Sequence, residues 1–532
     1  MAEAWYTGMG AIVLAISIIA SVISLWMSFE IARRSKKTVQ DYVLAGGTLG
    51  IVVLYFYGAF TIMSAWTFYG LSGWFYRYGH GIMIPWYMFI HLFQVAIITW
   101  LGIKLWGGAK YYGFPTPLAI YADRLESRAV RVVAAVANLI FLIPYLALQF
   151  PAIAFGLNAL VGAPYEFGFF YAAVIGALIA FIGGMRAVAY TNVLWGAIFL
   201  IAFVGTFALA LASLPKPFSD VTQEVLAKSS WLFSNPDPFG PLKLTGADRF
   251  AYAMGYILSG ISGCLWIHLM YIPMTLRSPL AMKWYPTLQF VSFSLIFTLM
   301  AGLIGTTVGY TLAPKLANPD QVFQVIATQC GGPWWGAFVW VGAFAAAVST
   351  IGTMIVAGAS LFSIDLVRTF KKEVDERKLL WWTRGFLWLV VAVSTIFGWL
   401  ATMGWRYIGL PAPIPLADFL SYVASPGFAL NIVLLIALYW KRATKVATIV
   451  SYIVGVVLLL IGYLYPPFTY VLTGLRGLPA LAIALPVELV LFFALSYATK
   501  PASEKAIEKW FDQLNKYLYE SPDPQVEGLK AS

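Results

Sequence analysis

Long apolar stretches separated by short polar segments run through almost the whole chain. A stretch of about 20 mainly apolar residues is long enough to cross a lipid bilayer as a helix. The pattern predicts thirteen such spans. They cover 8–31, 50–75, 81–106, 129–160, 165–184, 189–213, 249–275, 285–312, 333–365, 380–403, 416–440, 444–465 and 477–498.

The basic residues predict the orientation of these spans. With the N-terminus outside, most Lys and Arg fall in inner loops, as at 33–37 and 368–378. Because cytoplasmic loops are enriched in Lys and Arg, the N-terminus is expected outside and the C-terminus inside. Residues 214–248 then form a long outer loop. The inner tail, 499–532, carries an apolar stripe at helical spacing, either an interfacial helix or a solvated tail. The stripe consists of Ile507, Trp510, Phe511, Leu514 and Leu518.

Composition supports a membrane protein. Apolar residues make up 61% of the 532 residues and charged residues only 11%, which excludes a soluble enzyme and a disordered chain. The net charge of +11 lies in the loops, so it indicates topology and no nucleic-acid partner. Two cysteines are too few for a disulfide framework, and three histidines too few for a haem-rich subunit. No catalytic constellation is visible, so an enzyme is not expected.

Two spans are interrupted by glycines. The second span contains Gly58, Gly70 and Gly73, and the seventh contains Gly260 and Gly263. Corresponding interrupted spans in two halves of a transporter mark a binding site, because unwound backbone offers carbonyls to cations. Spans two and seven are five apart, which predicts a five-plus-five inverted repeat of spans 2–6 and 7–11. The expected segments are 1–49 (extra helix and inner loop), 50–213 (first repeat), 214–248 (outer loop), 249–440 (second repeat), 441–498 (two further spans) and 499–532 (tail).

Polar residues inside spans are functional candidates, because they are costly in lipid. Ser349 and Thr350 are adjacent hydroxyls in a stretch of small residues within span nine. Their oxygens suit a hard cation such as Na⁺, or they bond carbonyls of their own helix. His91, His268, Asp418 and Glu488 are further candidates. His268 directly follows the interruption in span seven, whereas a structural role is favoured for Glu488.

Five segments carry a resemblance to a known family. In chain order they are DYVLAGGTLG (41–50), SAWTFYGLSG (64–73), GGMRAVAYTNVLWGAIFL (183–200), IHLMYIPMTLRS (267–278) and AAAVSTIGTMIVAGASLFSIDLV (345–367). With them, residues 8–440 resemble the sodium:solute symporter family, which has a leucine-transporter-like fold. The chain departs from the family pattern at Thr191-Asn192, where the family usually has Thr-Asp, and at Trp195, which replaces Gln.

The resemblance implies a Na⁺ site and a substrate pocket. The Na⁺ ligands by position are the carbonyls of Phe60, Met63 and Ala346 and the hydroxyls of Ser349 and Thr350. The pocket lies between spans two, three, seven and eleven. Its candidate substrate-binding residues are Trp66, Thr67, His91 and His268.

The resulting hypothesis is a secondary active transporter of the plasma membrane that couples Na⁺ to uptake of a small organic solute by alternating access. A monocarboxylate or an amino acid is favoured over a sugar, because this aromatic lining offers few partners for many hydroxyls. No organic cofactor is expected, and a single chain suffices. A proton-coupled or uncoupled transporter of the same fold is the alternative, suggested by Asn192 and by the histidines near the pocket. A membrane sensor is the second alternative. The substrate, the stoichiometry and the oligomeric state stay open.

Overall fold

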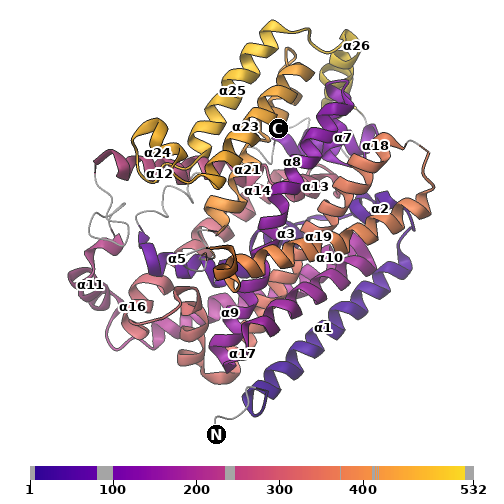
Figure 1. Cartoon of the computed structure of the whole chain (residues 1–532). Helices are drawn as coiled ribbons and strands as arrows, with labels where there is room; N and C mark the ends of the chain where they lie inside the picture. The colour runs from indigo at the N-terminus through magenta and orange to yellow at the C-terminus, as the bar shows by residue number, and fades with distance from the viewer. Residues whose placement is uncertain are drawn as a thin grey trace.

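The computed structural model describes residues 6–80, 100–233, 246–371, 373–409, 414, 416 and 419–521. Within these ranges the chain is helical, and the one β-bridge joins Leu49 to Leu276. The structure thus agrees with an all-α polytopic protein (Figure 1). The long helices are α1 (Met9–Arg34), α8 (Arg128–Ala147), α9 (Gln149–Val161), α10 (Tyr165–Ala212), α17 (Val322–Ser360), α19 (Glu376–Thr402), α23 (Lys445–Leu464) and α25 (Leu481–Ala498).

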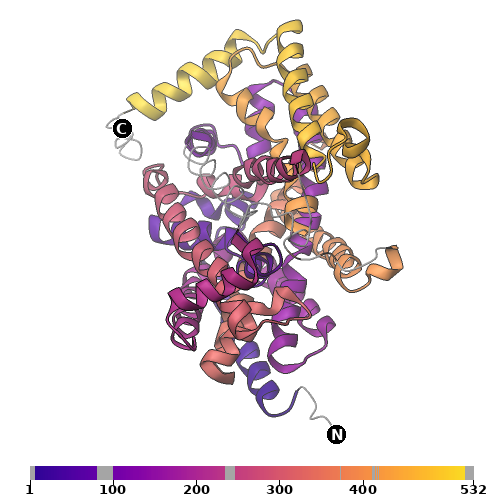
Figure 2. The same cartoon turned by 90° about the vertical axis from the view of Figure 1, so that its left-hand side faces the viewer.

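Seven of the described helical stretches are long and apolar enough to cross a membrane. The start of α1 and the tail helices α26 (Glu504–Ile507) and α27 (Leu514–Glu520) lie at opposite ends of the molecule in both views (Figures 1 and 2). An odd number of crossings gives this arrangement. The number thirteen, the orientation and the segment boundaries remain predictions.

Predicted spans five and six form one helix, α10, which folds back on itself. Its 48 residues would be about 72 Å long if straight, more than twice the ~30 Å thickness of the hydrocarbon layer. Gly184 interrupts the helix with φ 57° and ψ −154°. On either side of it, the Tyr171 hydroxyl lies 2.6 Å from Ser21 Oγ and Trp195 Nε1 donates to Ser24 Oγ at 2.8 Å. Because Ser21 and Ser24 are only about 4.5 Å apart along α1, the two arms of α10 run side by side.

Helix α17 is bent in the same way at its start. Gly332 has φ 79°, and Pro333 follows it. Across this bend Gln324 Nε2 donates to the Gly336 carbonyl at 2.9 Å, although the two residues are twelve positions apart. The longer arm begins at the bend, which is where the sequence predicts span nine to start. Its most apolar stretch is wholly buried, and α17 packs against α9, α10 and α19, so it forms the centre of the molecule.

Spans two and seven are broken, as the sequence predicts. Span two consists of α3 (Ile51–Ile62), α4 (Ala65–Phe68) and α5 (Gly70–Tyr78), with the break at residues 63–64. Span seven consists of α12 (Gly246–Ile261), a 3₁₀ turn (Ser262–Cys264) and α13 (Ile267–Met274), with the break at residues 265–266.

Spans eight and eleven contain π-helical turns, and spans three and eleven fall partly outside the described residues. Span eight runs through α14 (Ala281–Phe290), η4 (Val291–Thr298), α15 (Leu299–Leu303), η5 (Ile304–Val308) and α16 (Gly309–Leu312). Span eleven comprises η9 (Phe419–Ala424), α21 (Pro426–Ala429) and α22 (Ile432–Tyr439). Short connecting helices are α2 (Val39–Leu44), η1 (Ala45–Gly47), α7 (Pro117–Arg124), α11 (Phe218–Lys228), η2 (Ser230–Phe233), η6 (Pro319–Gln321), η7 (Leu361–Val367), α18 (Arg368–Phe370), η8 (Trp405–Ile408) and α24 (Phe468–Thr473). Asp418 and most of span three, with His91, lie outside the described residues.

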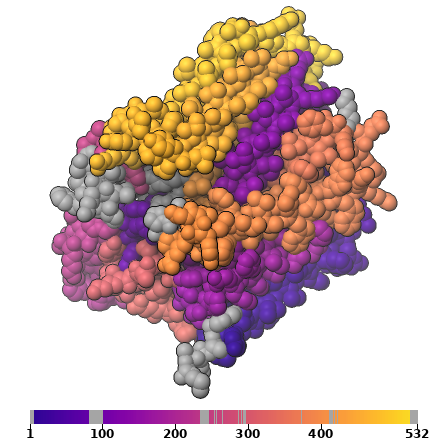
Figure 3. Space-filling view, in the orientation of Figure 1, coloured from indigo at the N-terminus to yellow at the C-terminus, as the bar shows by residue number. Residues whose placement is uncertain are grey.

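The C-terminal helices form a separate pair. In the space-filling view α23 and α25 (orange to yellow) lie beside α8 on one side of the body (Figure 3). Glu488 of α25 is buried between them, where a Cβ on Gly455 would come within 3.3 Å of its carboxyl carbon.

Three of the five residues of the tail stripe pack against the protein, whereas Ile507 and Phe511 are partly exposed, so the tail is a docked helix and not a solvated tail. Trp510, Leu514 and Leu518 are completely buried. They lie in η10 (Glu508–Gln513) and α27 and pack near Gly107 and Gly108, just after predicted span three.

Candidate functional site

The break in span two releases backbone carbonyls inside the membrane. Helix α3 ends at Ile62, and the N–H of Ser64 bonds the Ile62 carbonyl at 3.0 Å and not that of Phe60, four residues back. Ser64 then starts α4 by accepting a hydrogen bond from the Trp66 N–H on its side-chain oxygen at 3.2 Å. The exchange of a backbone partner for a serine cap frees the Phe60 carbonyl at this point.

Span nine meets this break. The Thr350 hydroxyl donates to the Thr61 carbonyl at 3.0 Å, and Thr350 is fully buried. The hydroxyls of Ser349 and Thr350 also lie 2.9 and 3.2 Å from the Ala346 carbonyl. The structure therefore brings Ser349, Thr350 and Ala346 to the span-two break that carries Phe60 and Met63. The Thr61 carbonyl is a further oxygen at this break, and the sequence interpretation did not include it.

The donor set consists of neutral oxygens. The described residues contain no cluster of His, Cys, Asp or Glu that would hold a metal ion. Hydroxyls and freed carbonyls between a broken helix and its neighbour are the groups that coordinate Na⁺ in transporters with broken helices. The residues therefore fit Na⁺ as a transported ion. A transition metal, which prefers imidazole or thiolate, does not fit them.

The predicted substrate residues of span two directly follow the break. Trp66 and Thr67 lie in α4 and are 3% and 0% exposed. The Trp66 ring meets the Trp74 ring edge-on at 6.5 Å. The Thr67 hydroxyl is buried and makes no hydrogen bond within the described part of the chain. The Thr67 hydroxyl therefore remains available to a ligand, close to the aromatic ring of the preceding Trp66.

His268 follows the break in span seven. Its ring stacks on Trp266 with centroids 5.8 Å apart, and the Tyr145 ring of α8 lies 5.4 Å away. His268 is fully buried, and neither ring nitrogen has a hydrogen-bond partner among the described residues. The other predicted histidine, His91, lies outside those residues.

Span four joins the two halves of the candidate pocket. Tyr145 contacts the His268 ring, and α9 packs against α4, which carries Trp66 and Thr67. Gln149, at the start of α9, is buried with both amide atoms unpaired in the described structure. Sequence reasoning missed Gln149, although an amide in an apolar span is a recognisable signal.

Positions 192 and 195, where the chain departs from the family pattern, differ in their contacts. Trp195 Nε1 donates to Ser24 Oγ, so this side chain anchors α10 to α1. Asn192 is 1% exposed, and its amide nitrogen has no partner among the described residues. A neutral amide therefore stands where the resemblance leads one to expect a carboxylate.

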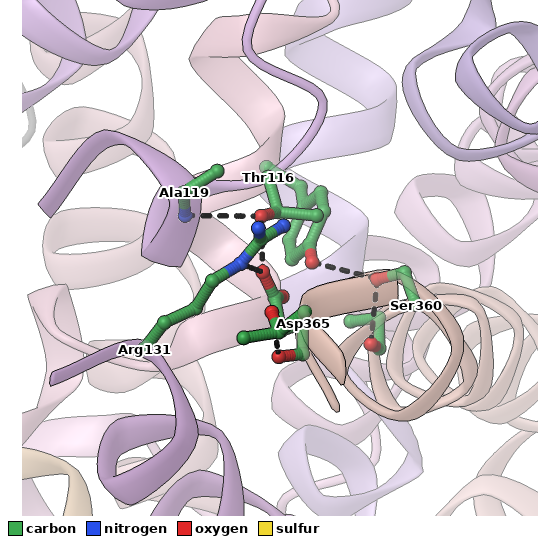
Figure 4. Close-up of polar contacts among 8 residues, drawn as sticks. Thr116, Ala119, Arg131, Ser360 and Asp365 are labelled. Carbon is green, nitrogen blue, oxygen red and sulfur yellow. Dashed lines mark hydrogen bonds and ion pairs between the residues drawn. The ribbon is translucent and has the colours of Figure 1, made fainter. Parts of the chain in front are cut away.

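A buried ion pair lies at the end of the molecule formed by α2, α7 and the tail, called here the inner end. Asp365 of η7 accepts hydrogen bonds from Arg131 Nε at 2.7 Å and from the Thr116 hydroxyl at 2.6 Å (Figure 4). Thr116 also caps α7 by accepting the Ala119 N–H at 3.1 Å. Helices α7, α8 and α17 are therefore joined at one carboxylate.

Further contacts close the inner end around the broken spans. Arg186 bonds Asp41 of α2 at 2.7 Å, and Tyr271 of α13 lies 2.6 Å from Ser360 of α17. Trp106 Nε1 donates to the Leu276 carbonyl at 3.1 Å, and Lys110 Nζ to the Gly47 carbonyl at 2.6 Å. These contacts tie the segments next to the broken spans to their neighbours on this side.

Comparison with known proteins agrees with this architecture. The family model described as "Sodium:solute symporter family" matches residues 42–455, most of the chain. The chain belongs to the sodium:solute symporter family. It is therefore a multi-pass transporter of the plasma membrane and not an enzyme, and the family implies Na⁺ as the coupling ion.

Individual relatives of this symporter are distant but cover most of its length. A sodium/proline symporter of Escherichia coli is 25% identical over 449 residues, covering 80% of this chain and 82% of the relative. An uncharacterized symporter of Bacillus subtilis, YodF, is 23% identical over 86% of this chain and 89% of its own. A Na⁺-coupled sialic acid symporter, solved in a substrate-bound outward-open state, shares the fold with a TM-score of 0.75 at 15% identity. That match covers 93% of this chain and all of the other.

Proposed function

We propose that this symporter couples the inward movement of Na⁺ to uptake of a small organic solute, an amino acid or a monocarboxylate. The observation that carries the proposal is the meeting of Thr350 with the span-two break, directly beside the helix that holds Thr67. The sodium/proline symporters among the relatives support an amino acid over a sugar.

Coupling follows from the shared broken segment. The carbonyls of Phe60 and Met63 with Ala346, Ser349 and Thr350 would hold Na⁺, and the Thr61 carbonyl lies beside them. Trp66 is only three positions after Met63, so an ion that orders the break also fixes the start of α4. A solute bound at Trp66 and Thr67 then binds more tightly with Na⁺ present, and the reverse holds by linkage.

Transport requires the inner contacts to separate. The broken spans end at contacts such as Tyr271–Ser360 and Lys110–Gly47, which close the inner side. Exchanging these contacts for others on the opposite side is alternating access. Each positive charge moved inward gains about 2.3 kcal/mol per 100 mV of membrane potential.

The test is uptake into proteoliposomes that contain the purified protein. Radiolabelled proline, alanine, lactate and glucose are offered with an inward Na⁺ gradient, with K⁺ in its place, or with a pH gradient alone. We expect Na⁺-driven accumulation of an amino acid or a monocarboxylate and none of glucose. Uptake that ignores Na⁺ and follows the pH gradient would contradict the proposal.

Proton-coupled transport is the second candidate function. Asn192 favours it, because a neutral residue there removes a carboxylate that could serve a cation. The pH-gradient arm of the same experiment separates the two candidates.

A further inference from the structure

Span four contains a buried glutamine whose side chain is unsatisfied. Gln149 begins α9 directly after Leu148, and its side chain is fully buried. Within the described ranges, neither its amide oxygen nor its amide nitrogen has a hydrogen-bond partner. Because burying an unpaired amide opposes folding, a folding role does not explain this side chain.

Gln149 lies on the face of span four that contacts both broken spans. Tyr145, four residues earlier, packs its ring 4.8 Å from Trp266 and 5.4 Å from His268 of span seven. Gly156, seven residues later, lies directly under the Tyr69 ring at the end of α4. Residues four and seven apart share one side of a helix, so Gln149 stands between the two contacts.

We infer that the Gln149 amide binds the transported solute, and that this solute is a zwitterion with a carboxylate and an ammonium group. The inference rests on the proposed function and narrows its substrate class. An amide offers N–H donors to a carboxylate and a carbonyl oxygen to an ammonium group. The Thr67 hydroxyl, which also lacks a partner within the described residues, is a second buried polar group, on the helix α4 that α9 contacts.

The charges of the surrounding helices agree with a zwitterion. Helices α4, α9 and α13 contain no Asp, Glu, Lys or Arg. A solute whose own charges cancel needs no protein countercharge, whereas a single buried ion does. These neutral helices therefore favour an amino acid, because a monocarboxylate would have only the co-bound Na⁺ as its countercharge.

The test compares two buried glutamines. Gln149→Met keeps the length of the side chain and removes both polar atoms. Gln324→Met is the matched control, because Gln324 accepts from the Tyr69 hydroxyl at 3.0 Å and donates to the Gly336 carbonyl at 2.9 Å. Melting temperatures are measured in Na⁺ without solute. A radiolabelled panel of amino acids with uncharged side chains, including proline, is offered to the parent. KM is then measured for the amino acid that the parent takes up best.

We expect Gln149→Met to melt at or above the parental temperature and to raise KM at least tenfold, while Gln324→Met melts lower. An unchanged KM, or a Gln149→Met protein that melts lower or does not fold, overturns the role of Gln149. In the parent, alanine should compete for uptake and propionate, which lacks the amino group, should not. Na⁺-driven uptake of monocarboxylates alone overturns the zwitterion but leaves the proposed function standing, whereas no Na⁺-driven uptake removes both.

Discussion

Three buried polar side chains between the broken spans of this symporter have polar atoms without a partner among the described residues, whereas two carboxylates at the inner end each accept hydrogen bonds from two other side chains. Thr67, Gln149 and His268 leave polar atoms unpaired between the broken spans. At the inner end, Asp365 accepts from Arg131 and Thr116, and Asp123 of α7 accepts from Lys509 and Trp510 of the tail. The difference separates two uses of polarity in one membrane body. The two carboxylates at the inner end join helices, whereas the unpaired atoms of Thr67, Gln149 and His268 are available to a ligand.

Removing one partner of the Asp365 pair is expected to have the largest effect. Asp365→Asn keeps the shape but leaves Arg131 without its countercharge in a buried place. Breaking a buried ion pair costs about 3–5 kcal/mol. We therefore expect a clear fall in melting temperature and in the yield of folded protein by size-exclusion chromatography.

The exposed pair Lys441–Asp512 provides the control for that variant. Its side chains are 59% and 62% exposed and 3.8 Å apart, so Asp512→Asn should melt like the parent. If Asp365→Asn also melted like the parent, the inner carboxylate would not be a structural joint.

Variants of the Na⁺ site should change ion affinity more than stability. Ser349→Ala and Thr350→Ala each remove one predicted ligand, and a bond to a charged partner contributes about 1.5–3 kcal/mol. The Na⁺ concentration for half-maximal uptake should therefore rise by about tenfold or more. Thr350→Ser keeps the oxygen and should stay near the parental value. If all three variants kept the parental Na⁺ concentration for half-maximal uptake, neither hydroxyl would belong to the Na⁺ site.

Thr67→Ala should give a smaller effect, restricted to the solute. Since the hydroxyl has no partner among the described residues, its loss should leave the melting temperature unchanged. A neutral hydrogen bond contributes about 0.5–1.5 kcal/mol, so KM should rise by about two- to tenfold. Initial uptake rates at varied solute and fixed Na⁺ measure this. A shift in Na⁺ affinity of the same size would place Thr67 in the ion site instead.

The smallest expected effect concerns the pH dependence of tail docking. The Ser503 N–H and hydroxyl donate to the Glu126 carboxylate at 2.7 and 2.8 Å, and these bonds lower the pKa of Glu126. A lowered pKa stabilises docking above the ordinary Glu value of about 4.3, and the contribution is lost as pH falls through the folded pKa. Protease cleavage of the tail should therefore rise slightly at acidic pH. In Glu126→Gln the cleavage rate should not change with pH over this range, and a parental pH profile there would contradict the assignment.

Element positions were largely predictable from the apolar pattern. The predicted span 444–465 corresponds to α23, Lys445–Leu464. The breaks in spans two and seven were also predictable, but the glycines of span two do not form its break. Gly58 lies under the Tyr285 ring and Gly73 against Asp320, where small size permits close packing. The break falls at Met63 and Ser64, where a serine cap and a neighbouring helix replace helical hydrogen bonds.

The parts that escaped prediction depend on contacts between distant segments. Trp510, Leu514 and Leu518 predict a helix, but nothing in their spacing says that it packs near Gly107, about 400 residues earlier. Gln149 stands out only when Tyr145 and Gly156 are seen to contact the two broken spans. Family resemblance gave Trp66, Thr67, Ser349 and Thr350 as candidates because they lie within quoted motifs, and Phe60 and Met63 by their position just before one of them. It gave no information on Gln149, which lies outside them.

The reversal of α10 at Gly184 has a consequence for how the protein is made. The two arms are joined without a loop, and a side chain at 184 would overlap the Tyr42 carbonyl and ring. The arms have no connecting loop that could stay in the aqueous phase while the second arm is being synthesised. The two arms must enter the bilayer together as one hairpin. An epitope tag or protease site inserted at residue 184 would therefore interrupt membrane insertion itself, long before it could report on which side the turn lies.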